Sequence, residues 1–177
     1  MALEGVNKHW SRHAGNIGGG VQIGEDFYEV FVNAEQNEKG MVAPRIIYQT
    51  NTEAGRSRNW EASRILYFYE GYLYNNGTWE YEKANIEDYQ MISAHEIGHE
   101  IILTFNGHIY SKTHKGTSHW SMIIQEEDKD ATYIPETGEI DLMKYYKNYY
   151  DIPRTIASET DVLGLLWLTK IEINEGY

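Results

Sequence analysis

The first half of the chain alternates between apolar and polar residues at a spacing that is typical of β-strands. Short runs rich in β-branched and aromatic residues recur between polar or glycine-containing stretches. An Asn-Gly pair at residues 76–77 separates two of these runs, and such a pair favours the tight turn of a β-hairpin. We therefore predict a small, mostly antiparallel, twisted sheet, with strands at residues 27–32, 46–49, 64–69, 72–75 and 78–81.

Helical spacing replaces this pattern in the second half of the chain. Ile97, Ile101 and Phe105 recur every four residues, and no proline interrupts the chain from Ile86 to Phe105. This spacing predicts a long and largely buried helix, and Gly107 is expected to end it because glycine readily adopts the left-handed conformation after a helix. Two short strands and a final apolar helix are expected later, at residues 109–111, at residues 122–124 and from Ser158 onward.

The order of these elements predicts a single α+β domain that spans residues 1–177. In this domain the small sheet packs on the long helix, and a C-terminal helix completes the fold. The chain has 177 residues, of which 41% are apolar, and this is enough to close a hydrophobic core around a site. Residues 1–20 include a glycine-rich run and show no clear periodicity, so we expect an irregular segment in which His9 and His13 are exposed.

Composition and charge exclude several classes of protein. The net charge of −12, without any cluster of Lys or Arg, disfavours a nucleic-acid ligand. The absence of cysteine excludes disulfides, thiolate-bound zinc and a thiol nucleophile. No apolar run is long enough to span a membrane, and the N-terminus has neither the basic nor the apolar region of a signal peptide. The abrupt start is also consistent with a piece of a longer protein.

The most informative motif is His95-Glu96-Ile97-Gly98-His99, inside the predicted long helix. Two histidines four residues apart lie on one face of a helix, so both imidazoles can reach a single zinc ion. Glu96 lies to the side of them, where a carboxylate can act as general base for a zinc-activated water. Burial of these polar side chains without a metal would leave them unsatisfied, which favours a zinc site over two surface histidines.

A catalytic zinc site needs a third protein ligand and one open position. Phe105 stands where the third histidine would follow in the most compact arrangement, so the ligand has to come from later in the chain. We favour His114, because its polar loop can fold back over the helix, whereas His108 is expected to point away. Ser158 and Asp161 have the spacing of a helix N-terminal capping box. The candidates that stay open beside His114 are His108, His119, Asp141, Glu159 and Asp161.

Together with this motif, further segments resemble zincin metallopeptidase domains of bacterial polymorphic toxins, at residues 5–12, 110–111, 114–118, 137–146 and 157–162. Such domains are often carried at the C-termini of larger proteins exported by type VI or related secretion systems. The resemblance implies a zincin-like fold with His114 as third ligand, delivery into a rival cell and a cognate immunity protein. It also places Thr117, Ser118 and Asp141 in the region of the site. His119 departs from the family pattern and would line the cleft.

These observations predict a zinc-dependent metallopeptidase that acts on a protein or peptide substrate. His95, His99 and His114 are expected to hold one Zn²⁺ ion. Glu96 is expected to accept a proton from the attacking water and to return it to the leaving amine. The protein would act in a target cell if it is exported as part of a larger effector, and in the cytoplasm otherwise. Two other functions stay open: a catalytically silent zinc-binding interaction module, and hydrolysis of cell-wall peptide crosslinks.

Other side chains are expected to support the reaction. A cationic or phenolic donor should stabilise the oxyanion of the substrate, and His119 and Tyr110 are the first candidates. Tyr145 and Tyr146 are alternatives that the sequence does not separate from them. An acidic side chain is expected to orient the ligating histidines, and the candidates for this role are Asp141 and Glu159.

Overall fold

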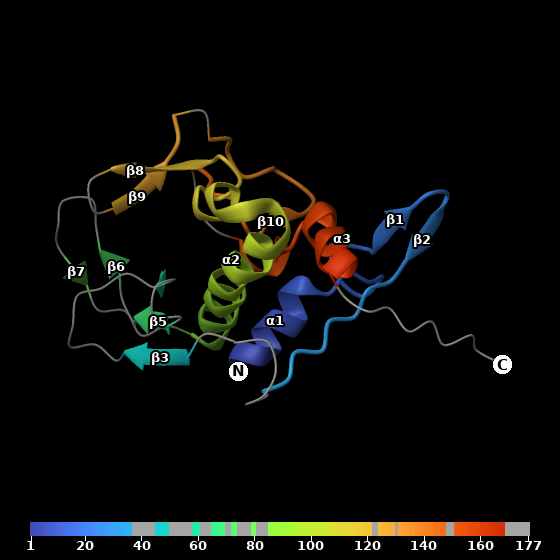
Figure 1. Cartoon of the computed structure of the whole chain (residues 1–177), viewed down its shortest axis with the longest axis horizontal. Helices are drawn as coiled ribbons and strands as arrows, with labels where there is room; N and C mark the ends of the chain where they lie inside the picture. Colours follow the sequence, from blue (N-terminus) through green and yellow to red (C-terminus); the bar gives the residue numbers. More distant parts are fainter. Residues whose placement is uncertain are drawn as a thin grey trace.

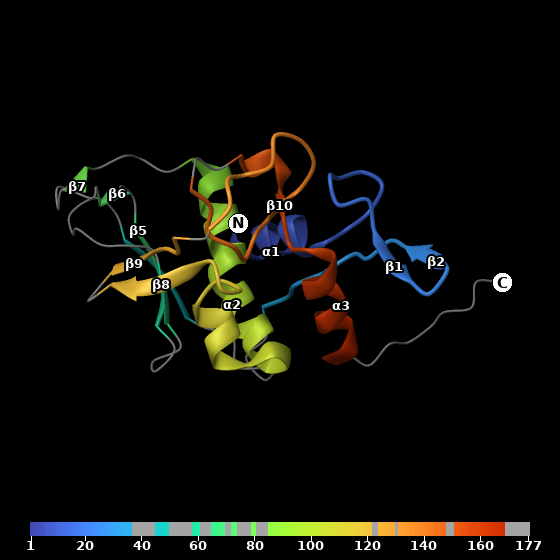
Figure 2. The same ribbon diagram turned by 90° about the horizontal axis from the view of Figure 1, so that it is seen from above.

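The computed structural model describes residues 1–36, 45–49, 58–60, 65–69, 72–73, 79–80, 85–121, 124–129, 131–147 and 151–168. Within these ranges the chain is an α+β protein with three α-helices, and its longest element, α2 (Ile86–Lys112), runs through the middle of the molecule. Strands from residues 45–80 lie on one side of α2, and helices α1 (Ala2–Trp10) and α3 (Glu159–Leu168) lie on the other (Figures 1 and 2).

The strands form several small sheets. The largest has the order β3–β5–β4, in which β3 (Arg45–Gln49) is parallel and β4 (Arg58–Trp60) is antiparallel to β5 (Ile65–Tyr69). Three further pairs are antiparallel: β1 (Val21–Ile23) with β2 (Asp26–Tyr28), β6 (Tyr72–Leu73) with β7 (Trp79–Glu80), and β8 (Ser118–Ser121) with β9 (Ile124–Glu127). The last pair, β10 (Ile140–Asp141) with β11 (Thr155–Ile156), is parallel, and a short 3-10 helix (Ile152–Arg154) precedes β11.

Most predicted strands are present, but within the described ranges they pair as separate small sheets and not as one. β3 and β5 begin or end within one residue of the predicted ranges 46–49 and 64–69, and β2 covers the start of the range 27–32. β6 pairs with β7 across the predicted turn at 76–77, which lies outside the described residues, as do residues 122–123 of another predicted strand. Periodicity and turn signals identify strands, but the choice of pairing partners depends on tertiary packing.

Helix α1 corrects the prediction of an irregular N-terminal segment. It packs so closely on α2 that a Cβ atom at Gly5 would overlap the backbone of Gln90. The indole Nε1 of Trp10 donates a hydrogen bond to the carbonyl oxygen of Ala94 (3.1 Å), and Trp10 is fully buried. Leu3, Val6 and Trp10 stand at helical spacing, so the helix has one apolar face, which it buries against α2.

The two histidines of the N-terminal segment have different surroundings. His9 lies on α1 with only 1% of its surface exposed, so its predicted exposure is wrong. Its Nδ1 donates a hydrogen bond to the carbonyl oxygen of Thr155 (2.7 Å). Burial lowers the pKa of His9 below its ordinary value of 6.5, and this hydrogen bond offsets the effect only in part. His13 follows the end of α1, is partly buried, and stacks on Phe31 with ring centroids 4.9 Å apart.

Helix α2 is interrupted at Gly107, where φ is 79°. This left-handed glycine confirms the predicted end of the straight helix. The chain then makes further helical turns as far as Lys112, so the predicted strand at 109–111 is wrong. The cause is a long-range contact, because the hydroxyl of Ser111 donates a hydrogen bond to the carbonyl oxygen of His99 (2.8 Å).

The hydrophobic core lies where the three helices meet, and α3 starts directly after Ser158, as predicted. Gly98 of the histidine motif belongs to this core, since a Cβ atom there would overlap the sulfur of Met143 and lie 2.9 Å from the ring of Trp10. Among the described residues, no helix is both long enough and apolar enough to cross a membrane. The buried residues of the core are Val6, Trp10, Val21, Met91, Ala94, Ile101, Ile102, Leu142, Met143, Ala157 and Val162.

Candidate metal centre

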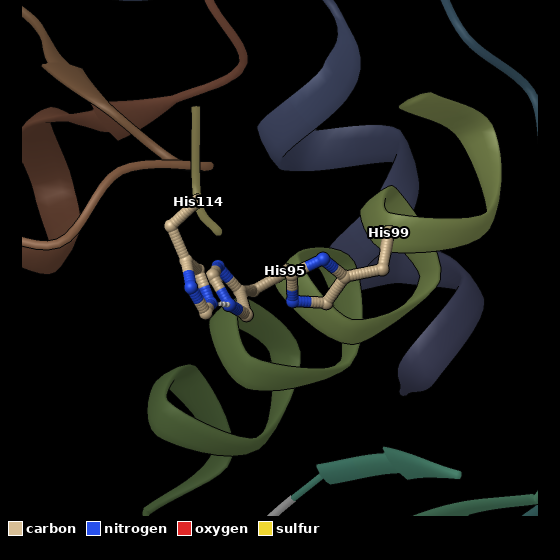
Figure 3. Close-up of side chains that lie close together, drawn as sticks. All are labelled: His95, His99 and His114. Carbon is tan, nitrogen blue, oxygen red and sulfur yellow. Dashed lines mark hydrogen bonds between the residues drawn. The ribbon is translucent and has the colours of Figure 1, made fainter. Parts of the chain in front are cut away.

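Three histidines from two parts of the chain meet beside α2. His95 and His99 project from successive turns of α2, and His114 comes from the loop that follows this helix (Figure 3). One ring nitrogen from each of the three lies within 4.8 Å of the other two. His99 and His114 are buried, whereas His95 is partly exposed. The structure therefore brings together the three residues that the sequence predicts as metal ligands.

Backbone carbonyl groups orient the two histidines of α2. Nδ1 of His95 donates a hydrogen bond to the carbonyl oxygen of Leu142 (2.7 Å). Nδ1 of His99 donates to the carbonyl oxygen of Ser111 (3.0 Å). Because a carbonyl oxygen can only accept, each Nδ1 carries the hydrogen and each Nε2 of the neutral ring presents a lone pair. Both rings are thus held in the tautomer that binds a metal through Nε2.

A hydroxyl group orients the third ring. Nδ1 of His114 lies 2.7 Å from Oγ of Ser118, which can accept its hydrogen. Two carbonyls and one hydroxyl therefore take the place of the acidic side chains that were expected to orient the histidines. The carboxylates of Asp141 and Glu159 bond elsewhere, to a lysine and to a backbone amide.

The distance between two of the imidazole nitrogens fits a tetrahedral zinc ion. Nε2 of His114 lies 3.2 Å from Nε2 of His95. Two nitrogens bound to one tetrahedral zinc ion at about 2.0–2.1 Å are separated by about 3.3 Å. No fourth His, Asp or Glu joins the group within the described part of the chain, so three protein ligands leave one position open, as in catalytic zinc sites. Imidazole donors also bind other first-row metals, so this geometry could hold a metal ion but does not specify the element.

Burial favours the neutral form of His99, one of the three candidate ligands. Burial lowers the pKa of His99 well below its ordinary value of 6.5, and the nearby His95 and Lys112 lower it further. The hydrogen bond to Ser111 opposes this shift only in part. Neutral imidazole is the form that binds metal ions, so His99 does not have to lose a proton at pH 7 before it can act as a ligand.

Glu96, the predicted general base, is buried on α2, with 7% of its surface exposed. It directly follows His95, so its Cβ lies about 100° around the helix axis from that of the ligand. The carboxylate is therefore carried beside the metal-binding face of the helix and not on it. This is the relation that the motif requires of a base.

The loop that carries His114 has an unusual backbone. His114 and Lys115 have φ angles of 50° and 59°, in the left-handed region that favours glycine, and Gly116 follows with 82°. Such conformations of other residues cost about 1–3 kcal/mol each and persist where the surroundings determine them. The N–H of Lys115 donates to the carbonyl oxygen of Tyr110 (2.9 Å), which helps to hold the turn. The strain falls at the third ligand, whose ring is turned toward α2.

Among the residues that the structure describes, Tyr145 lies against the histidines. Its ring stacks on that of His114, with centroids 3.7 Å apart and an angle of 28° between the planes, and its centroid lies 6.4 Å from that of His95. The N–H of Tyr145 donates to Oγ1 of Thr117 (2.7 Å), so the loop of the third ligand also positions this residue.

The other predicted oxyanion donors have different surroundings. Tyr110 lies on the last turns of α2 and is 37% exposed. The side chain of His119 is 45% exposed, and its Nδ1 lies 4.0 Å from the carboxylate of Asp128. The hydroxyl of Tyr146 accepts a backbone hydrogen bond of 3.0 Å. Sequence reasoning named Tyr145 only as an alternative, because no local pattern separates it from these residues.

The alternative third ligands lie outside the histidine group. His108 is exposed, as expected from the turn before it. Oε1 of Glu159 accepts a backbone hydrogen bond, and Asp161 is fully buried against Lys115. The N–H of Asp161 also donates to Oγ of Ser158 (3.3 Å), so the predicted capping contact is present. Within the described ranges, none of these residues belongs to the group that can hold a metal.

A buried lysine beside the third ligand was missed by the sequence analysis. Nζ of Lys115 lies 2.5 Å from Oδ2 of Asp141 and 2.8 Å from Oδ2 of Asp161. Burial alone would lower the pKa of Lys115, but these two carboxylates outweigh it, so the pKa lies above its ordinary value of 10.5. Burial raises the pKa of Asp161, which shares one ammonium with Asp141. The sequence offers one signal for this lysine, which is that Lys115 directly follows His114.

Comparisons with family models, with curated proteins and with solved structures found no match to this chain. The resemblance to zincin domains, the export route and the immunity partner therefore stay predictions, and the function has to be inferred from the site.

Proposed function

We propose that this protein is a zinc-dependent metallopeptidase in which His95, His99 and His114 hold one zinc ion. The supporting observation is the convergence of their Nε2 atoms, two of which are only 3.2 Å apart. His95 and His99 direct their Nδ1 hydrogens at carbonyl groups, so their Nε2 lone pairs face the shared space. Lone pairs at this distance repel one another unless a proton or a cation lies between them.

The proposed reaction is hydrolysis of a peptide bond. Zinc, when bound, acts as a Lewis acid that polarises the scissile carbonyl and makes water a stronger acid. Glu96 accepts a proton from the attacking water and passes it to the leaving amine. Tyr145, which lies against His114, replaces Tyr110 and His119 as the candidate for donating a hydrogen bond to the substrate oxyanion.

Two observations favour a catalytic site over a structural zinc site. The described residues provide three ligands, whereas a structural zinc ion normally has four. Glu96, which follows the candidate ligand His95 on α2, is also buried, and a carboxylate next to the metal-binding face of a helix is what a general base requires. We therefore prefer the peptidase to a silent binding module.

The decisive experiment is the variant Glu96→Gln, which keeps the shape of the side chain but removes the base. Zinc content should stay at the wild-type level, while the rate of hydrolysis should fall by about 10²–10⁴-fold. Zinc would be measured by elemental analysis, and hydrolysis on a panel of denatured proteins and on purified peptidoglycan. Glu87→Gln is the matched control, because Glu87 is an exposed residue on the same helix.

The outcomes separate the proposals. Full activity of Glu96→Gln would remove Glu96 from the mechanism. Wild-type protein that binds zinc but cleaves neither type of substrate would support a binding module instead. Cleavage of peptidoglycan alone would redirect the proposal to cell-wall peptides.

A further inference from the structure

Lys115 contacts the segments that hold two of the three histidines in place. It directly follows His114, and its ammonium lies 2.5 Å from Oδ2 of Asp141. The residue after Asp141 is Leu142, whose carbonyl oxygen accepts the hydrogen bond from Nδ1 of His95 (2.7 Å). One cation therefore links the loop that supplies the third ligand to the strand that orients the first.

Helix α3 and the residue before it provide the remaining contacts of this ammonium group. Nζ of Lys115 lies 2.8 Å from Oδ2 of Asp161 and 3.0 Å from Oγ of Ser158. The side chains of Lys115, Asp141 and Asp161 are 6%, 12% and 0% exposed. Val162, the next residue of α3, is fully buried in the hydrophobic core. Asp161 therefore stands directly beside a residue of the hydrophobic core.

Stability alone does not account for this arrangement. Two carboxylates face one ammonium, and Oδ1 of Asp161 has no hydrogen-bond partner among the described residues. Buried ion pairs of this kind add little stability compared with apolar side chains of similar volume. The left-handed backbone at His114 and Lys115 adds a further cost. The ion pairs do fix the position of the loop that carries His114 relative to the segment that carries Leu142.

We propose that Lys115 is a positioning residue of the metal centre. It holds the loop of His114 and the carbonyl group that orients His95 at the separation that a bound metal requires. This inference rests on the zinc site of the proposed function and is independent of the substrate. Without the ammonium, Asp141 and Asp161 repel each other and the strained loop relaxes, which moves Nε2 of His114 away from that of His95.

The test compares Lys115→Met with Lys144→Met. Nζ of Lys144 lies 3.9 Å from the same Oδ2 of Asp141, but its side chain is 39% exposed, so it is a matched control. Zinc affinity would be measured by competition with a chromophoric chelator. The absorption spectrum of the cobalt-substituted protein would report the ligand geometry. Lys115→Met should bind zinc about 10–100-fold more weakly, as expected for loss of an orienting group, and its cobalt spectrum should change. Lys144→Met should match the wild type in both measurements.

A second variant covers failure of the first to fold. Lys115→Met combined with Asp161→Asn removes one of the two uncompensated carboxylates, and it should show the same loss of zinc affinity. Circular dichroism with a chelator present would establish that each variant is folded. A folded variant with a lower melting temperature but wild-type zinc affinity and cobalt spectrum would overturn the inference and leave the peptidase proposal intact. Absence of zinc uptake by the wild-type protein would overturn both.

Discussion

Two pairs of histidines in this chain are spaced four residues apart, and only one of them belongs to the candidate metal centre. His95 and His99 lie on the uninterrupted part of α2, with ring centroids 4.9 Å apart. His9 lies near the end of α1, which finishes at Trp10, so His13 falls in the following loop. The four-residue spacing places two side chains on one face only while the helix continues. Two histidines four residues apart can therefore form one site only where the same helix carries both of them.

Each of these two pairs has one buried histidine, His99 or His9, and the surroundings of these two residues also differ. Nδ1 of His99 and Nδ1 of His9 both donate to backbone carbonyls. Nε2 of His99 faces a space that is shared with His95 and His114, whereas Nε2 of His9 has no hydrogen-bond partner among the described residues. A buried histidine becomes a ligand when other donors converge on its free nitrogen. By this criterion His9 is a structural residue.

The largest expected effect comes from removing one member of each pair. His99→Ala should weaken zinc binding by more than about 100-fold, because loss of an orienting group alone costs about 10–100-fold. His9→Ala should leave zinc affinity unchanged and lower the stability of the fold. Chelator competition and chemical denaturation would measure the two quantities. Equal loss of zinc affinity in both variants would contradict the distinction.

Disturbing the packing of α1 should affect stability without affecting the metal centre. Gly5→Ala places a methyl group against the backbone of Gln90, and such overpacking costs about 1–3 kcal/mol. Urea denaturation in the presence of a chelator would measure the loss, with Glu4→Ala as an exposed control on the same helix. The folded variant should keep wild-type zinc affinity. A parallel loss of affinity would mean that α1 belongs to the site.

A smaller effect is expected when the hydroxyl that orients His114 is removed. Ser118→Ala should weaken zinc binding by about tenfold, at the lower end of the range for orienting groups. Thr113→Ala is the control, because the hydroxyl of Thr113, beside His114, donates instead to the carbonyl oxygen of Ile109 (2.7 Å). If the two variants behave alike, Ser118 does not orient the ligand.

The smallest expected effect is a pH dependence of stability from His9. Its pKa is lower in the folded protein than the ordinary 6.5, so the folded state binds this proton less readily than the unfolded state. The stability contributed by neutral His9 is complete above pH 6.5 and is lost as the pH falls from there through the folded-state pKa. With a chelator present, the unfolding free energy of His9→Gln should therefore decrease less steeply than that of the wild type as the pH is lowered below 6.5. Identical slopes would refute this assignment.

Parts of the molecule that depend on local pattern were predictable. The stripe of Ile97, Ile101 and Phe105 located α2, Gly107 its interruption, and Ser158 the start of α3. The two failures have different causes. The helical turn at 109–111 forms through the distant contact of Ser111 with α2. Helix α1 has a local signal, because Leu3, Val6 and Trp10 stand at helical spacing, and this signal was overlooked beside the glycine-rich run that follows.

The sequence by itself determined that two histidines share one helix face with a glutamate beside them, because an uninterrupted helical stripe is a property of neighbouring residues. It also ruled out thiolate ligands. Only the tertiary structure decided that His114 completes the group, that Tyr145 lies against it and that Lys115 is buried behind it. These arrangements depend on contacts between residues far apart in the chain, such as His95 with Leu142, 47 positions apart, and Lys115 with Asp161, 46 positions apart. No local spacing encodes which distant segments meet.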